Sequence, residues 1–258
     1  MSTEMSTTNR LFVLSIAGFD PSGGAGLLAD VKTFEMLGCY GLAVNTANTI
    51  QNDKKLEACY WTSEAIILKQ LEILLDSFPV EVVKIGIVEN LQVLTKVIDK
   101  LFVRNQNIKI IWDPVIKSSS GFSFQEPLKF QKNLESVLER IFLITPNFNE
   151  IKMFYPELPM EGIIRKIGGK TNLYLKGGHR MANIGLDELF TTEEGKCLRL
   201  EPGRTDCSEK HGSGCVLSSA LAAHLALGES LPEACQNAKA YTEKILGSNN
   251  TLLAYHNI

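Results

Sequence analysis

Short apolar runs rich in β-branched residues alternate with longer segments of helical periodicity along most of the chain. Such runs are typical of buried strands, and here they end in glycine or in polar residues. They lie at 11–18, 80–88, 109–112, 142–145 and 172–175. Strands that alternate with helices favour a mostly parallel sheet covered by helices on both faces.

The helical segments each carry an apolar side. Leu28, Val31 and Phe34 share one side of a helix that Gly38 ends. Asn90 is the expected N-cap of a later helix. The apolar face of that helix carries Leu91, Leu94, Val97, Ile98 and Leu101.

The remaining segments complete an α/β pattern. Helices are predicted near 148–155, 160–168, 214–227 and 230–247, and paired strands at 186–192 and 195–202. The segment 39–62 fits the strand–helix alternation less well, and we expect it to form a small β flap over a site. The expected fold is a doubly wound, mostly parallel central sheet in a single domain over 1–258. The first nine or so residues of this domain are expected to form a polar tail.

Composition narrows the classes of partner. The chain of 258 residues has a net charge of −3 and no run of lysine or arginine, which argues against nucleic acid or an anionic membrane. No apolar run reaches the roughly 18–20 residues that span a bilayer, and the N-terminus lacks the layout of a signal peptide. The six cysteines form no CxxC pair, so a reducing cytoplasm is expected.

Unusual polar residues collect where the predicted parallel strands end. Ligands of open α/β sheets bind beyond these carboxyl ends. The residues there belong to the segments GFDPSGGAG, GIVEN, DPV, PNFNE and KGGH. Five strand ends therefore direct polar groups toward one edge of the sheet.

Two carboxylates at neighbouring strand ends suggest a metal site. Asp113 ends one strand, and Asn147 and Glu150 follow the next. Such a pair can orient Mg²⁺ through water. The alternative is that Asn147 and Glu150 only cap the next helix, and both interpretations can hold together.

Three further polar residues have both functional and ordinary interpretations. Lys176 precedes two glycines and can meet a nucleotide phosphate or simply be solvated. Asp30 lies one helical turn inside its helix, where it can accept hydrogen bonds from a ligand or face solvent. His179 has no partner at metal-ligand spacing, so a structural role is favoured over a ligand role.

The segment HGSGC at 211–215 combines a glycine turn with a cysteine in the first turn of a helix. Gly212, Ser213 and Gly214 supply backbone donors for an anion. The helix N-terminus is expected to lower the pKa of Cys215 below the ~8.5 of a free thiol. The alternative is a small residue that packs at the start of a buried helix.

Taken in order, these segments resemble a known family over nearly the whole chain. The stretches SIAGFDPSGGAGLLADVKTF, NTANTIQN, VKIGIV, IIWDPVI, ITPNFNEI, LKGGH and HGSGCVLSSALAAHLALG are similar to those of hydroxymethylpyrimidine/phosphomethylpyrimidine kinases of thiamine biosynthesis. That family belongs to the ribokinase-like superfamily, most of whose sugar kinases carry Asp where this chain has Cys215.

The resemblance implies a phosphotransferase that uses ATP and Mg²⁺. It would phosphorylate 4-amino-5-hydroxymethyl-2-methylpyrimidine and then its monophosphate, as a cytoplasmic homodimer. The resemblance implies that Gly18, Asp30 and Gln51 bind the pyrimidine and that Cys215 transfers the proton. It implies that Gly212, Ser213 and Gly214 form the anion hole. It also implies that Asp113 and Glu150 bind Mg²⁺ and that Lys176 and Asn147 bind the ATP phosphates.

Two other functions remain open at this point. A pyridoxal-type kinase would share the architecture and phosphorylate a hydroxymethyl group on a similar ring. A non-catalytic pyrimidine-binding sensor would keep the fold without transfer, although the presence of Asp113, Glu150, Lys176 and Cys215 speaks against it.

Overall fold

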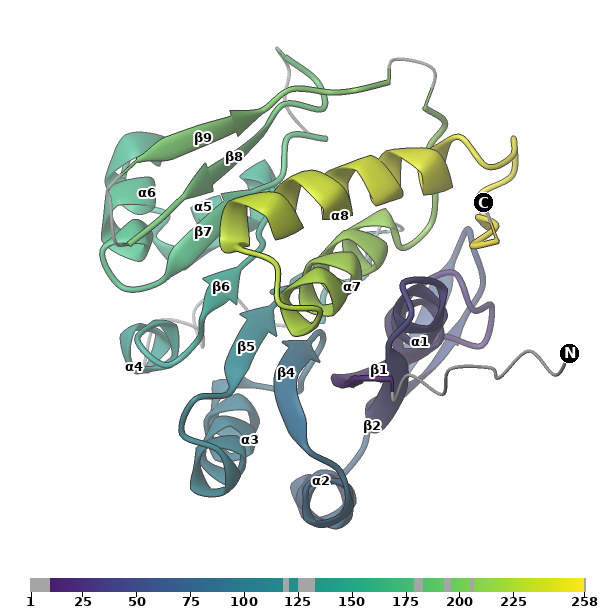
Figure 1. Ribbon diagram of the computed structural model, residues 1–258, viewed down its shortest axis with the longest axis vertical. Helices are drawn as coiled ribbons and strands as arrows, with labels where there is room; N and C mark the ends of the chain where they lie inside the picture. The colour runs from purple at the N-terminus through teal and green to yellow at the C-terminus, as the bar shows by residue number, and fades with distance from the viewer. Residues whose placement is uncertain are drawn as a thin grey trace, which may run out of the picture.

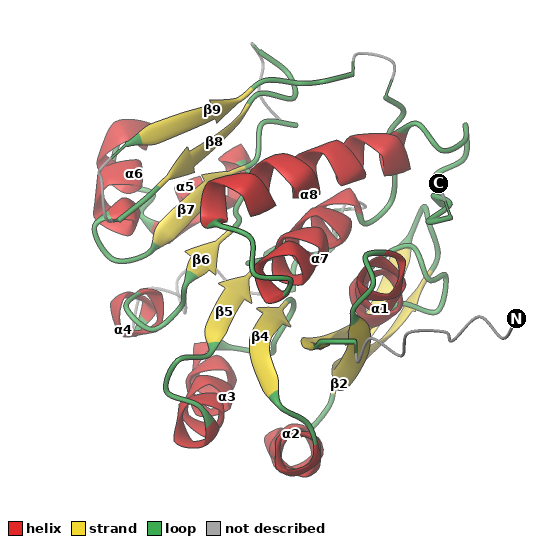
Figure 2. Cartoon of the chain, viewed as in Figure 1, coloured by secondary structure: helices red, strands yellow, loops and turns green. Residues whose placement is uncertain are grey.

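A single nine-stranded sheet forms the centre of the protein (Figures 1 and 2). The computed structural model describes residues 10–117, 121–124, 133–178, 183–192, 196–204 and 207–257. The strands are β1 (Phe12–Phe19), β2 (Tyr40–Gln51), β3 (Leu56–Trp61), β4 (Val80–Ile85), β5 (Lys109–Trp112), β6 (Leu143–Ile144), β7 (Asn172–Leu175), β8 (Asp187–Phe190) and β9 (Cys197–Leu200). Their spatial order is β3-β2-β1-β4-β5-β6-β7-β8-β9.

The strand order reverses at β1, as a doubly wound sheet requires. Strand β1 pairs in parallel with β2 on one side and with β4 on the other. Strands β4 to β7 continue in parallel, whereas β3, β8 and β9 are antiparallel to their neighbours. The carboxyl ends of six parallel strands, β2 included, therefore lie along one edge.

Helices cover both faces of this sheet (Figure 2). Three of them, α1 (Gly26–Met36), α7 (Ser213–Ala226) and α8 (Leu231–Leu246), cover one face. The other face carries α2 (Glu64–Ser77), α3 (Leu91–Arg104), α4 (Leu134–Leu138), α5 (Phe148–Phe154) and α6 (Met160–Gly168). Successive strand residues alternate between the two cores, so Val13 belongs to the core under α1, α7 and α8, and Leu14 to the core on the other face.

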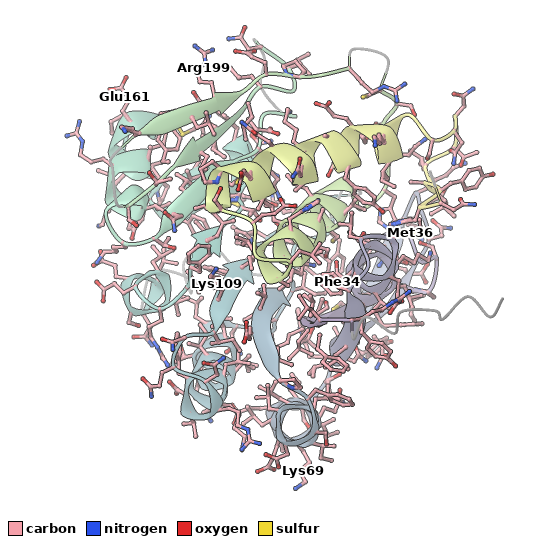
Figure 3. The ribbon with its side chains drawn as sticks, viewed as in Figure 1. Phe34, Met36, Lys69, Lys109, Glu161 and Arg199 are labelled. Carbon is pink, nitrogen blue, oxygen red and sulfur yellow. The ribbon has the colours of Figure 1, made fainter. Side chains whose placement is uncertain are left out.

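Apolar and charged side chains of these helices differ in how far they are buried (Figure 3). Phe34 of α1 is fully buried against the sheet, whereas Lys69 of α2 extends into solvent. Helix α7 is buried almost all round because it lies between the sheet and α8, and Ala220, Ala222 and Ala223 permit that close packing. The position of its N-terminus is therefore fixed by the core.

Most predicted elements are confirmed, including Asn90 as the N-cap of α3, where its side chain accepts the Val93 N–H at 3.0 Å. The predicted apolar face of α1 was right for the buried Phe34 but wrong for Leu28, which is 36% exposed, and for the half-buried Val31. Leu27 and Asp30 are buried instead. The segment 39–62 is more than a flap, because β2 is an internal strand and only its end pairs with β3 as a projecting ribbon. Helix α2 was not predicted.

In the part of the chain that the structure describes, no helix has both the length and the apolar character that a membrane span needs.

Candidate active site

Four of the predicted site residues converge at the carboxyl edge of the sheet. Lys176 follows β7 and its Nζ lies 2.8 Å from Asp113 Oδ1 and 3.8 Å from Glu150 Oε2. Asn147 forms a β-bridge with Lys176, which brings the ends of β6 and β7 together. The predicted clustering of strand-end residues is therefore confirmed for this group.

Asp113 is the buried centre of this cluster. Its side chain has no exposed surface, and the hydroxyls of Thr145 and Ser218 each donate to it at 3.2 Å. The side chain of Lys176 is 13% exposed, so the solvated alternative for this lysine was wrong. Burial alone would lower the pKa of Lys176, but Asp113 and Glu150 raise it, so the ammonium keeps its charge.

Asn147 and Glu150 form a capping box at the start of α5. The Asn147 Oδ1 accepts the N–H of Glu150 at 2.9 Å, and Glu150 Oε2 accepts the N–H of Asn147 at 2.8 Å. The predicted capping role is thus confirmed. Burial raises the pKa of Glu150 to about 7, with Lys176 opposing the rise and Asp113 adding to it.

The glycine turn before α7 packs directly against the glycine turn before α1. Gly212 has a φ of 78°, and a Cβ there would lie 2.0 Å from the carbonyl oxygen of Gly24. Gly26 has a φ of 58°, and a Cβ there would lie 2.2 Å from the carbonyl oxygen of Gly18. Only glycine permits both the left-handed conformation and the close approach. Two helix N-termini therefore meet at this edge.

An interaction that the sequence analysis missed joins these two turns. Asp20 Oδ2 lies 2.9 Å from His211 Nε2 and accepts the N–H of Ala25 at 2.9 Å. Asp20 Oδ1 accepts the N–H and hydroxyl of Ser22, both at 2.8 Å. An Asp-Pro-Ser sequence after a strand is a turn signal that could have identified Asp20 as a local acceptor.

Cys215 lies in the first turn of α7 and is partly exposed. Its predicted low pKa was wrong, because burial raises the pKa of the thiol to about 11. Lys84 and a hydrogen bond from the N–H of Gly26 oppose this rise, whereas Asp30 and Asp113 add to it. Removal from water therefore outweighs the effects of Lys84 and of the Gly26 N–H in the free protein.

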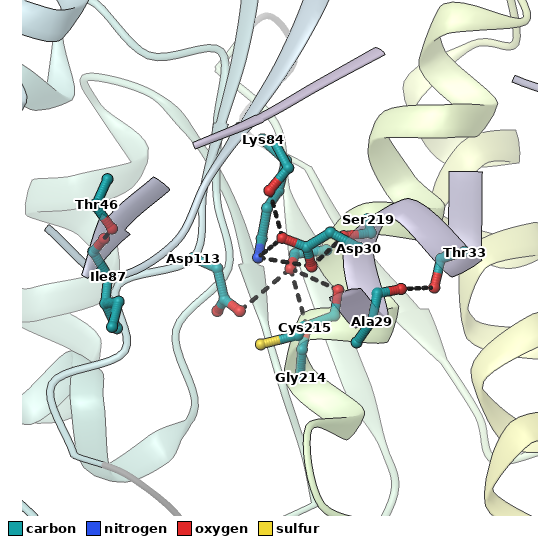
Figure 4. A network of polar contacts seen from close by, with 12 residues as sticks. Ala29, Asp30, Thr33, Thr46, Lys84, Ile87, Asp113, Gly214, Cys215 and Ser219 are labelled. Atoms are coloured by element: carbon teal, nitrogen blue, oxygen red, sulfur yellow. Dashed lines mark hydrogen bonds and ion pairs between the residues drawn. The ribbon is translucent and has the colours of Figure 1, made fainter. Parts of the chain in front are cut away.

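Asp30 is fully buried, so the solvent-facing alternative was wrong as well. It forms an ion pair of 2.8 Å with Lys84, whose side chain is also without exposed surface (Figure 4). Ser15 donates to Asp30 Oδ2 at 2.5 Å and Ser219 donates to Oδ1 at 2.7 Å. Lys84 was missed, although a lysine inside the apolar run VEVVKIGIV requires a buried partner.

Gly18 and Gln51 lie on β1 and β2, which are separated from β7 and Lys176 by three strands of the sheet. A Cβ on Gly18 would lie 2.5 Å from Ile87 Cδ1, so this glycine allows two strand ends to pack closely. Gln51 ends β2 in the projecting ribbon, three residues after Asn48, which pairs with Phe19. Its alternation matches that of the buried Ala47 and Thr49 rather than that of the exposed Asn48 and Ile50. His179 lies outside the described residues.

The fold and the sequence together define a kinase of ribokinase-like architecture. The sequence matches the family model described as phosphomethylpyrimidine kinase over residues 20–257. The hydroxymethylpyrimidine/phosphomethylpyrimidine kinase of Rhizobium meliloti (strain 1021) is 34% identical over 249 residues, which cover 93% of this chain and 91% of that protein. This chain belongs to the phosphomethylpyrimidine kinase family.

Solved structures agree with this assignment. A phosphomethylpyrimidine kinase from Clostridium difficile 630 has a TM-score of 0.73 and 30% identity, and the match covers 90% of this chain and 98% of that one. The pyridoxal kinase from Staphylococcus aureus in complex with ADP has a TM-score of 0.81 at 23% identity, covering 96% and 93%. The second likeness shows the fold alone. The predicted fold and the predicted class of phosphotransferase are confirmed.

Proposed function

We propose that this protein transfers the γ-phosphoryl group of ATP to the hydroxymethyl group of 4-amino-5-hydroxymethyl-2-methylpyrimidine, and a second phosphoryl group to the resulting monophosphate. The observation that supports this most is the position of Gly214. A Cβ on Gly214 would lie 3.2 Å from Lys176 Nζ and 3.8 Å from Asp113 Oδ2. The N-terminus of α7 thus faces the buried Lys176–Asp113 pair directly.

The phosphate side of the reaction falls to α7 and to Lys176. The first N–H groups of a 14-residue helix have no carbonyl partner within the helix, so the backbone from Gly212 to Gly214 can hold the migrating group. The Lys176 ammonium and the side-chain amide of Asn147 are our candidates for the ATP phosphates. Positioned positive charge is the main requirement of phosphoryl transfer, because negative charge spreads over the transferred oxygens.

Asp113 and Glu150 fit a magnesium ion that is held largely by phosphate and water. The described residues contain no group of three or more His, Cys, Asp or Glu side chains that could hold a metal alone. Two neighbouring carboxylates suit Mg²⁺, which keeps much of its water. When bound with ATP, the ion would neutralise phosphate charge.

The acceptor side falls to Gly18, Gln51 and Cys215. The carboxamide of Gln51 can donate to and accept from an aminopyrimidine edge. Cys215 would contact the acceptor hydroxyl and take its proton in the thiolate form. Because burial raises the pKa of this thiol to about 11, the thiolate is a minor form at neutral pH. We treat the chain as one kinase domain; the homodimer and the cytoplasmic location stay predictions.

The test is a comparison of acceptors with the purified protein, ATP and Mg²⁺. Products would be identified by phosphorus NMR after incubation with the hydroxymethylpyrimidine, its monophosphate or pyridoxal. We expect a monophosphate and then a pyrophosphate from the two pyrimidines. Faster turnover of pyridoxal would instead assign a pyridoxal-type kinase. Pyrimidine binding without ADP release would assign a non-catalytic sensor.

A further inference from the structure

Lys84 is a buried charge for which the proposed reaction has not yet accounted. It lies within β4, and its ammonium bonds to both oxygens of Asp30 at 2.9 and 2.8 Å. Among the described residues, Asp30 is its only hydrogen-bond acceptor. Burying such a pair is costly, and apolar residues of similar volume often serve stability equally well. This ion pair therefore suggests a role beyond packing.

The ammonium of Lys84 reaches toward the active-site edge. A Cβ on Gly86, two residues further along toward the carboxyl edge, would lie 3.2 Å from Lys84 Nζ. The missing side chain at Gly86 thus leaves room for the ammonium. Ser219, which donates to Asp30, lies one helical turn after Cys215 on the same face of α7. Figure 4 shows Lys84 and Asp30 beside the first turn of α7, close to Cys215.

Charged groups from four elements act on the Cys215 sulfur. Lys84 from β4 favours its negative form, and Asp30 from α1 and Asp113, just after β5, oppose it. Lys176, just after β7, interacts with it as well. The charge of Lys176 is shared with Asp113 and Glu150, whereas Lys84 has the largest favourable effect on the sulfur. The N–H of Gly26 adds a hydrogen bond to the sulfur.

We propose that Lys84 is a positioning residue that stabilises negative charge on Cys215, and that Asp30 serves to hold the Lys84 ammonium in place. Each oxygen of Asp30 accepts one bond from Lys84 and one from Ser15 or Ser219, and none of its surface is exposed. Asp30 thus acts on the acceptor site through Lys84 and not by contact with the pyrimidine. The inference rests on the proposed function for its catalytic meaning.

Alkylation of Cys215 tests this inference without substrate. Iodoacetamide reacts with the thiolate, forming a carbon–sulfur bond as iodide leaves, so the rate reports the thiolate fraction. Rates at pH 9 would be measured on the Cys215 peptide by mass spectrometry, with the exposed Cys197 as an internal reference. We expect Lys84→Met to react about tenfold more slowly, which corresponds to one unit of pKa. An unchanged rate would overturn the proposal.

Two further variants separate the charge effect from a loss of folding. Lys239→Met removes another buried lysine, which lies on α8 and pairs with Asp187 of β8 at 3.0 Å. This variant should leave the alkylation rate of Cys215 unchanged. The double variant Lys84→Met with Asp30→Asn removes both charges, and it decides the test if the single variant does not fold. We expect the double variant to react more slowly than the wild type and faster than Lys84→Met. A wild-type rate in the folded double variant would also overturn the proposal.

Kinetics with the pyrimidine complete the test. We expect Lys84→Met to lower kcat while the KM for the pyrimidine stays within about twofold, because Lys84 acts on the sulfur that accepts the proton and not on the bound pyrimidine. A raised KM with unchanged kcat would instead assign this network to substrate binding and overturn the proposal. A wild-type protein without kinase activity would refute the proposed function, while slowed alkylation in Lys84→Met would still support the Lys84–Cys215 interaction.

Discussion

Asp20 links the two glycine turns of the active site through His211, whose Nε2 lies 2.9 Å from Asp20 Oδ2. Both side chains are buried. The turn before α1 and the turn before α7 are far apart in sequence, and this pair joins them beside Gly24 and Gly212. The geometry of the anion-binding edge therefore depends on a contact between residues outside either helix.

Replacement of Asp20 by Asn should make the free energy of unfolding less dependent on pH. Burial would raise the pKa of Asp20, but hydrogen bonds from His211 and Ser22 lower it below its usual value. The unfolded state then binds more protons than the native state, so this stabilisation is present above pH 4 or so and is lost as the pH falls through the native pKa. Urea unfolding between about pH 2 and 7 should show a shallower pH dependence for Asp20→Asn, with stability about 1–3 kcal/mol lower at neutral pH. Parallel curves for the two proteins would contradict this.

Replacement of Asp30 by Asn should destabilise the protein strongly. The change leaves the fully buried Lys84 without its carboxylate partner. Breaking a buried pair in this way costs about 3–5 kcal/mol. Asp76→Asn is the matched control, because Asp76 lies 3.5 Å from Arg104 on the surface and its loss should cost about 1 kcal/mol or less. Similar denaturation midpoints for the two variants would show that the Asp30–Lys84 pair does not stabilise the packing of α1 against β4.

Replacement of Gly214 by Ala should reduce activity while leaving the fold intact. The added methyl group would lie 3.2 Å from Lys176 Nζ, in the space that we assign to the migrating phosphoryl group. A displacement of about 1 Å in such a site can lower kcat about 10²-fold. Alanine suits a helix better than glycine, so the melting temperature should not fall. Gly168→Ala, with nothing within 4 Å of the added atom, should keep full activity. Wild-type kcat in Gly214→Ala would place the phosphoryl group elsewhere.

The pH dependence of kcat distinguishes the two roles that Cys215 can have. Burial raises the pKa of this thiol to about 11, so the thiolate fraction grows as the pH rises through the neutral range. If the thiolate accepts the hydroxyl proton, kcat should increase up to about tenfold per pH unit between roughly pH 7 and 9. A pH-independent kcat would mean that the thiol only positions the acceptor oxygen.

The sequence predicted the strand-end cluster because each of its residues depends on a local signal. A polar residue directly after an apolar run marks a strand end, and parallel strands bring such ends to one edge. Asp113, Asn147, Glu150 and Lys176 all follow this rule, and the structure places them together. The capping box of Asn147 and Glu150 follows from spacing alone.

Contacts between distant segments could not be predicted in the same way. The side of α1 that faces the core depends on where α7 packs, so Leu28 was preferred to Asp30 on hydrophobicity alone. The acidity of Cys215 depends on how much water its neighbours exclude, and a helix N-terminus gives no measure of that. Asp20 and His211 are 191 residues apart, and only the packed fold brings them into contact.

The most direct measurement is the kcat of Cys215→Ala with the hydroxymethylpyrimidine, ATP and Mg²⁺. The rate of ADP release gives this kcat. Cys197→Ala, which removes an exposed cysteine on β9, is the control and should keep the wild-type kcat. If the edge where α7 meets Lys176 and Asp113 is the site of transfer and Cys215 is its base, Cys215→Ala should lower kcat about 10²–10⁴-fold. A wild-type kcat in Cys215→Ala would contradict the account.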